Sequence, residues 1–102
     1  MPIGLIVKAD EPARFFSSIE SAERYLEAID VRDGVYPAAY GPRGEPYIIG
    51  VVGDRVVIEQ LEGELRAGEL RDLLKNFLAA VGANAEGDLT DLITACEQYI
   101  AE

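Results

Sequence analysis

The sequence predicts a single α+β domain in which an antiparallel sheet packs against amphipathic helices. Three observations support this prediction. Two β-rich runs flank a Gly-Asp pair in the middle of the chain, and two segments with helical spacing of apolar residues occupy the last third. No repeat, low-complexity tract or linker divides residues 1–102, so we expect one compact domain. The expected order of elements is β-α-β-β-β-α-α.

The N-terminal part is expected to form one strand and one helix. Ile3 to Lys8 is a short β-rich run that ends at the polar breaker Asp10-Glu11-Pro12. Ser17 or Ser18 can then cap a helix that extends to about Ile29, because a serine oxygen accepts the free N–H groups of the first turn. The apolar face of this helix would consist of Ile19, Ala22, Leu26 and Ile29.

Three strands are expected in the middle of the chain. The first is Val35 to Tyr40, and Pro37 suggests that it lies at an edge of the sheet. Tyr47 to Val52 and Arg55 to Leu61 are the most strand-like runs. Gly53-Asp54 between them suits a tight hairpin, since glycine accepts a positive φ.

The last third is expected to be helical. Apolar residues recur with helical spacing from Leu70 to Val81, and Gly82 is placed to end that helix. Asp88 can cap a final helix. Its apolar face would consist of Leu89, Leu92, Ile93, Cys96 and Ile100.

The charge balance disfavours one class of partner and favours another. The 19 acidic and 9 basic side chains give a formal net charge of −10. Such a chain repels phosphate backbones, so we expect it not to bind nucleic acid directly. A basic protein surface would be attracted instead.

The residue types that are missing argue against most enzyme chemistry. The chain has no His and one Cys, so it lacks the commonest general base and cannot form an internal disulfide or a Cys-rich zinc site. We expect no metal and no cofactor. The apolar run at the N-terminus is too short for a secretion signal, and no segment approaches the roughly 18 apolar residues of a membrane span. The expected location is the cytoplasm.

Neither the cysteine nor the carboxylates indicate a catalytic site. Cys96 has no His to activate it and falls on the apolar stripe of the last helix, which predicts a buried structural residue. Several carboxylates lie near the ends of predicted elements, but nothing marks an acid–base pair among them. We therefore expect no enzyme. These carboxylates are Asp30, Asp33, Glu59, Glu62 and Glu64.

Tyrosines are the candidate anchors for a protein partner. Tyr36 and Tyr40 would share one face of a strand by their period-two spacing, and pairing across the next turn would bring Tyr47 near them. Tyrosine is enriched at interfaces because it offers a large contact area at low cost in side-chain entropy. The alternative is that the three rings pack at the edge of the core. The acidic side chains likewise form either a solvated face or a docking surface.

One segment has a resemblance to a known group of proteins. It runs from Ser18 to Val31 (SIESAERYLEAIDV) and continues with Gly34-Val35-Tyr36, Tyr40 and Gly44. It resembles small acidic bacterial immunity proteins encoded beside polymorphic or contact-dependent toxins, which share such a helix, a GxY strand and a tyrosine hairpin. Where those sequences tend to carry an acidic residue after the second tyrosine, this chain has Gly41-Pro42.

The resemblance implies a non-enzymatic inhibitor that uses an acidic, tyrosine-bearing surface to bind one cognate toxin, which would carry a basic surface. Tyr36, Tyr40 and Tyr47 would then be the anchors, and the five carboxylates named above would be the rim charges. Two other classes stay open. One is a homodimeric structural or regulatory interaction domain that uses an open sheet edge or the helix pair. The other, ranked last, is a small-molecule-binding domain or an enzyme that uses carboxylates.

Overall fold

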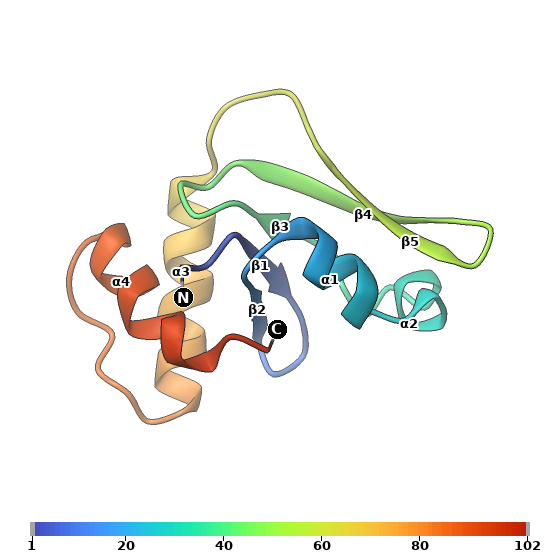
Figure 1. Ribbon diagram of the computed structural model, residues 1–102. Helices are drawn as coiled ribbons and strands as arrows, with labels where there is room; N and C mark the ends of the chain where they lie inside the picture. The colour runs from blue at the N-terminus through green and yellow to red at the C-terminus, as the bar shows by residue number, and fades with distance from the viewer. Residues whose placement is uncertain (1, 102) are drawn as a thin grey trace.

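The computed structural model describes residues 2–101 and contains a five-stranded antiparallel sheet with the strand order β2-β1-β3-β4-β5 (Figure 1). The α+β class predicted from the sequence is therefore confirmed. The longest two strands, β4 and β5, form a hairpin. The bounds are Leu5–Lys8 for β1, Ala13–Phe16 for β2, Ala39–Tyr40 for β3, Pro46–Val52 for β4 and Arg55–Gln60 for β5.

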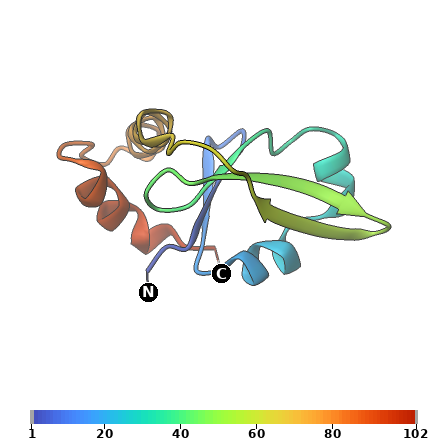
Figure 2. The ribbon, with the colours of Figure 1, turned by 90° about the horizontal axis from the view of Figure 1, so that it is seen from above.

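Helices lie on both faces of this sheet (Figure 2). One face carries α1 (Ile19–Tyr25) and α2 (Ala28–Arg32). The other carries α3 (Ala67–Ala80) and α4 (Leu89–Cys96), which continues into a 3₁₀ turn. Among the helices formed by residues 2–101, none combines the length and the apolar character that a membrane span needs.

Strand β1 is buried on both faces. Leu5, Ile6 and Val7 have no exposed surface, and successive side chains of a strand point to opposite sides. Ile6 therefore packs under α3 and α4, whereas Leu5 and Val7 pack under α1 and α2. The domain thus has two hydrophobic clusters, one on each side of the sheet.

The cluster under α3 and α4 is rich in aromatic and leucine side chains. The rings of Phe15 and Phe77 meet edge to face with centroids 4.7 Å apart. No side chain of β4 or β5 belongs to this cluster within the described part of the chain. Its buried members are Ile3, Ile6, Ala13, Phe15, Tyr40, Leu70, Leu73, Leu74, Phe77, Leu78, Leu92 and Cys96.

The cluster under α1 and α2 does include the hairpin. Val56 and Ile58 of β5 are buried in it, and Ile49 of β4 packs against it. Its remaining buried members are Leu5, Val7, Ala9, Phe16, Ala22, Leu26, Tyr36 and Ala39. The hairpin is therefore covered by helices on one face only.

The sequence prediction misses β2, so the observed order is β-β-α-α-β-β-β-α-α. Strand β2 has four residues and directly follows Pro12. Phe15 and Phe16 are both fully buried, each in a different cluster. A short strand that is apolar on both faces shows no alternation, and for that reason periodicity does not reveal it.

The single helix predicted up to Ile29 is wrong in its second half. Its start is confirmed, because the Ser18 hydroxyl accepts a hydrogen bond of 3.1 Å from the Ser21 N–H. Helix α1 ends at Tyr25, and Leu26 adopts an extended conformation that inserts its side chain into the core. Ile29 then falls in α2 with 60% of its surface exposed, so it is not part of a buried face.

The strand predicted from Val35 to Tyr40 shrinks to two residues, Ala39 and Tyr40. Strand β3 lies between β1 and β4, so the edge position expected from Pro37 is wrong. Pro37 precedes the paired residues, and its missing N–H therefore costs the sheet no hydrogen bond.

Other elements of the prediction are confirmed. Val52 pairs with Arg55 across the Gly53-Asp54 loop, as a tight hairpin requires. Helix α3 ends just before Gly82, which has a φ of 73°. Asp88 caps α4 through a reciprocal pair of hydrogen bonds with Asp91.

At both edges of the sheet, backbone groups of the edge strand bond to another part of the chain. At the β2 edge, Ile100 forms a parallel bridge with Phe15, and the Ala101 N–H donates to the Phe15 carbonyl at 2.8 Å. At the β5 edge, the Glu23 carboxylate of α1 accepts the outward N–H of Ile58, also at 2.8 Å. These contacts occupy backbone groups that would otherwise be available to other strands.

Gly44 joins the β3–β4 turn to the start of α3. Its carbonyl accepts the Arg66 N–H at 2.8 Å, and a Cβ atom at this position would lie 2.6 Å from the Ala67 nitrogen. Its φ of 96° is also one that other residues rarely adopt. Gly68, the second residue of α3, has neither restriction, and a Cβ there would meet open space.

We expect the substitutions Gly44→Ala and Gly68→Ala to change stability in opposite directions. The first should lower the free energy of unfolding by about 2 kcal/mol or more, because it combines a backbone clash with a strained φ. The second should raise it by about 0.5–1 kcal/mol, because alanine favours a helix over glycine. Urea denaturation of both variants measures this, and equal effects would contradict the close contact at Gly44.

Candidate protein-binding site

The three tyrosines predicted as anchors do not form a common surface. Tyr36 and Tyr40 are only 7% and 4% exposed, and they belong to different clusters on opposite faces of the sheet. The expected shared face is wrong because period-two spacing holds only along a continuous strand, and Tyr36 lies outside β3. Tyr47 is half-buried and packs against the cluster under α1 and α2, of which Tyr36 is a buried member. The burial fits core packing for the first two rings.

The buried tyrosines have polar partners at their rims. The Tyr40 hydroxyl donates to the Glu69 carboxylate of α3 at 3.1 Å, and burial together with this bond raises the pKa of Tyr40. The Arg14 guanidinium lies 5.9 Å from the centre of the Tyr36 ring and 5.6 Å from that of Tyr25. Burial is also the main cause of the raised pKa of Tyr36.

The five carboxylates predicted as rim charges are accessible but lie in three places. Asp30 and Asp33 are on α2 and at its C-terminal end. Glu59 is on β5, on the face that no helix covers. Glu62 and Glu64 are in the exposed segment that leads into α3. The two carboxylates at α2 lie close together, as do the two before α3, but the five carboxylates do not form one surface.

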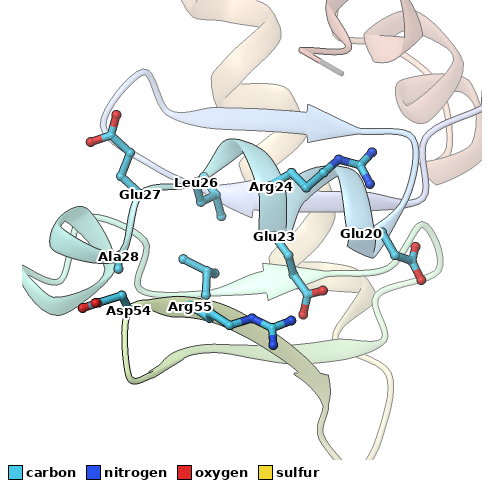
Figure 3. Close-up of a pocket in the computed structure, with 9 residues that line it drawn as sticks. Glu20, Glu23, Arg24, Leu26, Glu27, Ala28, Asp54 and Arg55 are labelled. Atoms are coloured by element: carbon cyan, nitrogen blue, oxygen red, sulfur yellow. The ribbon is translucent and has the colours of Figure 1, made fainter.

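A different acidic site lies between α1 and the β5 edge (Figure 3). It is an open groove of about 570 Å³. The buried side chains of Leu26 and Val56 form its apolar floor. Four carboxylates and two guanidinium groups line it, which gives a formal local charge of −2. The charged residues are Glu20, Glu23, Arg24, Glu27, Asp54 and Arg55.

Two contacts position the acidic groups of this groove. Glu23 is held at the β5 edge by its bond to the Ile58 N–H, and its side chain points toward Arg55 (Figure 3). At the hairpin tip, the Arg32 side chain donates to the Gly53 carbonyl and lies 3.6 Å from the Asp54 carboxylate. Helix α2 thereby fixes the tip of the hairpin beside the groove. Glu20 extends from the first turn of α1 at the other end (Figure 3).

The sequence contains part of the signal for this site. Glu20 and Glu23 are spaced three residues apart, which places them on one side of α1, whereas Glu27 lies beyond the end of that helix. Asp54 sits in the predicted hairpin loop. That the two features meet depends on the sheet order and on α1 lying along β5, neither of which local spacing reveals.

Cys96 is buried without any exposed surface, as predicted, and its environment is apolar. Removal from water raises the pKa of its thiol from 9.0 to about 11, because burial disfavours the thiolate. No group of three or more His, Cys, Asp or Glu side chains in residues 2–101 is arranged to hold a metal ion.

Comparison with known proteins finds no match to a family model, to a curated protein or to a solved structure.

We expect Glu23→Ala to expose the Ile58 amide and to destabilise the domain. The variant leaves a part-buried N–H without its acceptor, which should cost about 1–2 kcal/mol. Amide hydrogen exchange at Ile58 should accelerate by about tenfold. Glu23→Gln is the matched control, since its amide oxygen can still accept the bond. Equal exchange rates in both variants would show that the carboxylate does not protect this amide.

We expect the thiol of Cys96 to make stability decline in alkali. Between pH 9 and about pH 11 the unfolded chain releases the thiol proton while the folded chain retains it. Stability is therefore complete below the unfolded pKa and falls as pH rises through this window, by about 2–3 kcal/mol. Cys96→Ala lacks this response. Urea denaturation at each pH measures the difference in the free energy of unfolding between the two proteins. This difference should narrow between pH 9 and about pH 11, and a constant difference would contradict the raised pKa of the Cys96 thiol.

Proposed function

We propose that this chain is a non-enzymatic protein-binding module, and more specifically an immunity protein that neutralises a cognate bacterial toxin. The observation that supports the binding function best is the acidic groove between α1 and β5. It combines an apolar floor, formed by Leu26 and Val56, with carboxylates from two separate elements. An Arg or Lys side chain of a partner would bury its apolar stem on that floor and place its charge among the carboxylates.

The charge of the whole chain favours such a partner. A net charge of −10 draws a basic surface from a distance and speeds encounter, whereas the groove supplies the local contacts. Rim carboxylates on α2 lie on the same side of the sheet as α1. In this proposal, Asp30 and Asp33 extend the acidic surface around Asp54 at the hairpin tip.

The immunity role rests on the resemblance of residues 18–44 and on the chemistry of the groove. Toxins that act on nucleic acids carry basic clefts for phosphates, and an acidic protein that occupies such a cleft competes with the substrate. The proposal leaves the activity of the toxin open. It places the interaction in the cytoplasm of a bacterium, where a toxin would reach its target.

The test uses the proteins encoded by the genes beside this one. We expect one of them to stop growth when expressed alone, and co-expression of this chain to restore it. Calorimetry with the purified, catalytically disabled toxin should then give a tight one-to-one complex. Higher salt should slow association much more than dissociation. If no neighbouring product binds this chain or is neutralised by it, the immunity role is wrong.

A pair of charge-matched variants locates the binding surface. Glu20→Gln/Glu23→Gln/Asp54→Asn neutralises the groove and keeps the hydrogen-bond acceptor for Ile58. Glu62→Gln/Glu64→Gln/Glu86→Gln removes the same charge from exposed sites elsewhere. We expect the groove variant to weaken the dissociation constant by about tenfold or more, and the control by about threefold or less. The reverse ranking would place the partner on another face.

A further inference from the structure

Strand β5 is the last strand of the sheet, and the acidic groove runs along part of its outer edge. In an antiparallel pair, alternate residues direct both their N–H and C=O groups to the same side. The Ile58 N–H points away from β4 and bonds to Glu23, so the backbone groups of Val56 point outward as well. No hydrogen bond within residues 2–101 occupies the outward N–H of Val56. The groove therefore borders a strand that can still pair.

Glu23 occupies the neighbouring pairing position. Its carboxylate accepts the Ile58 N–H at 2.8 Å and comes from α1, on the far side of the groove (Figure 3). An arriving strand can pair fully at Ile58 only if its own carbonyl replaces this carboxylate. The carboxylate then loses a hydrogen bond, and a positively charged group is the partner that best replaces it.

A strand added beside β5 would place alternate side chains in the groove. Val56 and Ile58 are 8% and 6% exposed, and both face the cluster under α1 and α2. Residues that lie opposite each other in a sheet have their side chains on the same face. The two residues opposite Val56 and Ile58 would therefore face α1, and the residue between them would lie on the other face, beside Val57.

The charge of the groove matches two basic side chains at these positions. Its four carboxylates and two guanidinium groups leave a formal charge of −2. A basic residue opposite Ile58 would lie beside Glu23. One opposite Val56 would lie nearer the hairpin tip, where Asp54 is placed. The apolar stems of both side chains would cover the floor formed by Leu26 and Val56.

We infer that the groove binds an extended segment of the partner, with basic residues at two alternate positions, that pairs with β5 as a further strand. This inference rests on the binding function proposed above for the same groove. A carbonyl of the segment takes the Ile58 N–H from Glu23, and the released carboxylate binds a basic side chain of the segment. The exchange leaves the Ile58 N–H bonded before and after binding, and it selects a basic segment over a neutral one.

A second copy of this chain does not meet these requirements. Its own β5 edge would present Val56, Ile58 and Gln60 to the groove, and none of these side chains is basic. Pairing of two β5 edges would also bring two acidic grooves together, on chains that each have a net charge of −10.

Short peptides test the inference on the full chain without the toxin. The probe is acetyl-TVKVKVT-amide, whose lysines share one face of a strand, and the control is its isomer acetyl-TVKKVVT-amide, whose lysines do not. In NMR titrations, the probe should shift the amide signals of Val56 and Ile58 with a dissociation constant of about 1 mM or below, and the isomer should bind at least about fivefold more weakly. Equal affinities, or no binding of the probe up to about 5 mM, would overturn the inference.

Backbone methylation separates strand pairing from simple attraction of charge. N-methylation of both lysines removes the N–H groups that would face β5, and it should weaken binding of the probe by about tenfold or more. N-methylation of the central valine is the matched control, because that N–H points away from β5, and it should change binding by about threefold or less. If both methylated probes bind equally well, the segment does not pair with β5 and the inference is wrong.

Two variants of Glu23 test the exchange at Ile58. Glu23→Ala frees the Ile58 N–H, so the neutral peptide acetyl-TVQVQVT-amide should bind this variant about threefold or more tightly than it binds the unchanged chain. Glu23→Gln retains an acceptor for the amide and should not gain this affinity. In both variants the preference for the lysine probe over the neutral peptide should fall by about threefold. Identical behaviour of the two variants toward the neutral peptide would contradict the exchange.

The result can be separated from that of the immunity test. A neutralised toxin together with equal binding of both methylated probes would leave the proposed function intact and overturn strand addition. Conversely, the expected order of peptide affinities supports strand addition even if no neighbouring gene product is neutralised, and in that case only the immunity role fails.

Discussion

Burial of β1 on both faces is the constraint on which the rest of the structure depends. A strand with Leu5 and Val7 on one side and Ile6 on the other must be covered twice, which a sheet with helices on one face cannot do. The chain therefore places α1 and α2 on one side and α3 and α4 on the other. The hairpin is longer than its neighbouring strands, so its outer end is left with cover on one side only.

Elements whose signals lie in neighbouring residues could be predicted from the sequence. Helix α3 has five buried apolar residues at helical spacing, Asp88 caps α4, and Gly53-Asp54 connects two long β-rich runs. The sequence was insufficient where contacts between distant residues decide which secondary structure forms. Phe15 and Phe16 form a strand because both faces of β2 are buried, and Leu26 leaves the helix to fill the core without a glycine or proline to mark the break.

The candidate site was less predictable than the fold for a related reason. Carboxylates can be counted in a sequence, but whether they meet depends on sheet order. Glu20 and Asp54 are far apart in the chain, yet they line one groove because α1 lies along the last strand of the sheet. Conversely, Tyr36 and Tyr40 are close in sequence, yet the sheet separates them. The resemblance to immunity proteins remains the source of the toxin hypothesis, and the groove supplies its physical basis.

The pairing of Ala101 with Phe15 has a consequence for how the protein is made. During translation the ribosome releases β1 and β2 early, whereas residues 100 and 101 emerge after every other described element. Throughout that interval the nascent chain carries an uncovered β2 edge, which can pair with the strands of neighbouring nascent chains on the same messenger RNA. A chaperone that holds this edge until residues 100 and 101 have emerged would therefore favour the native state.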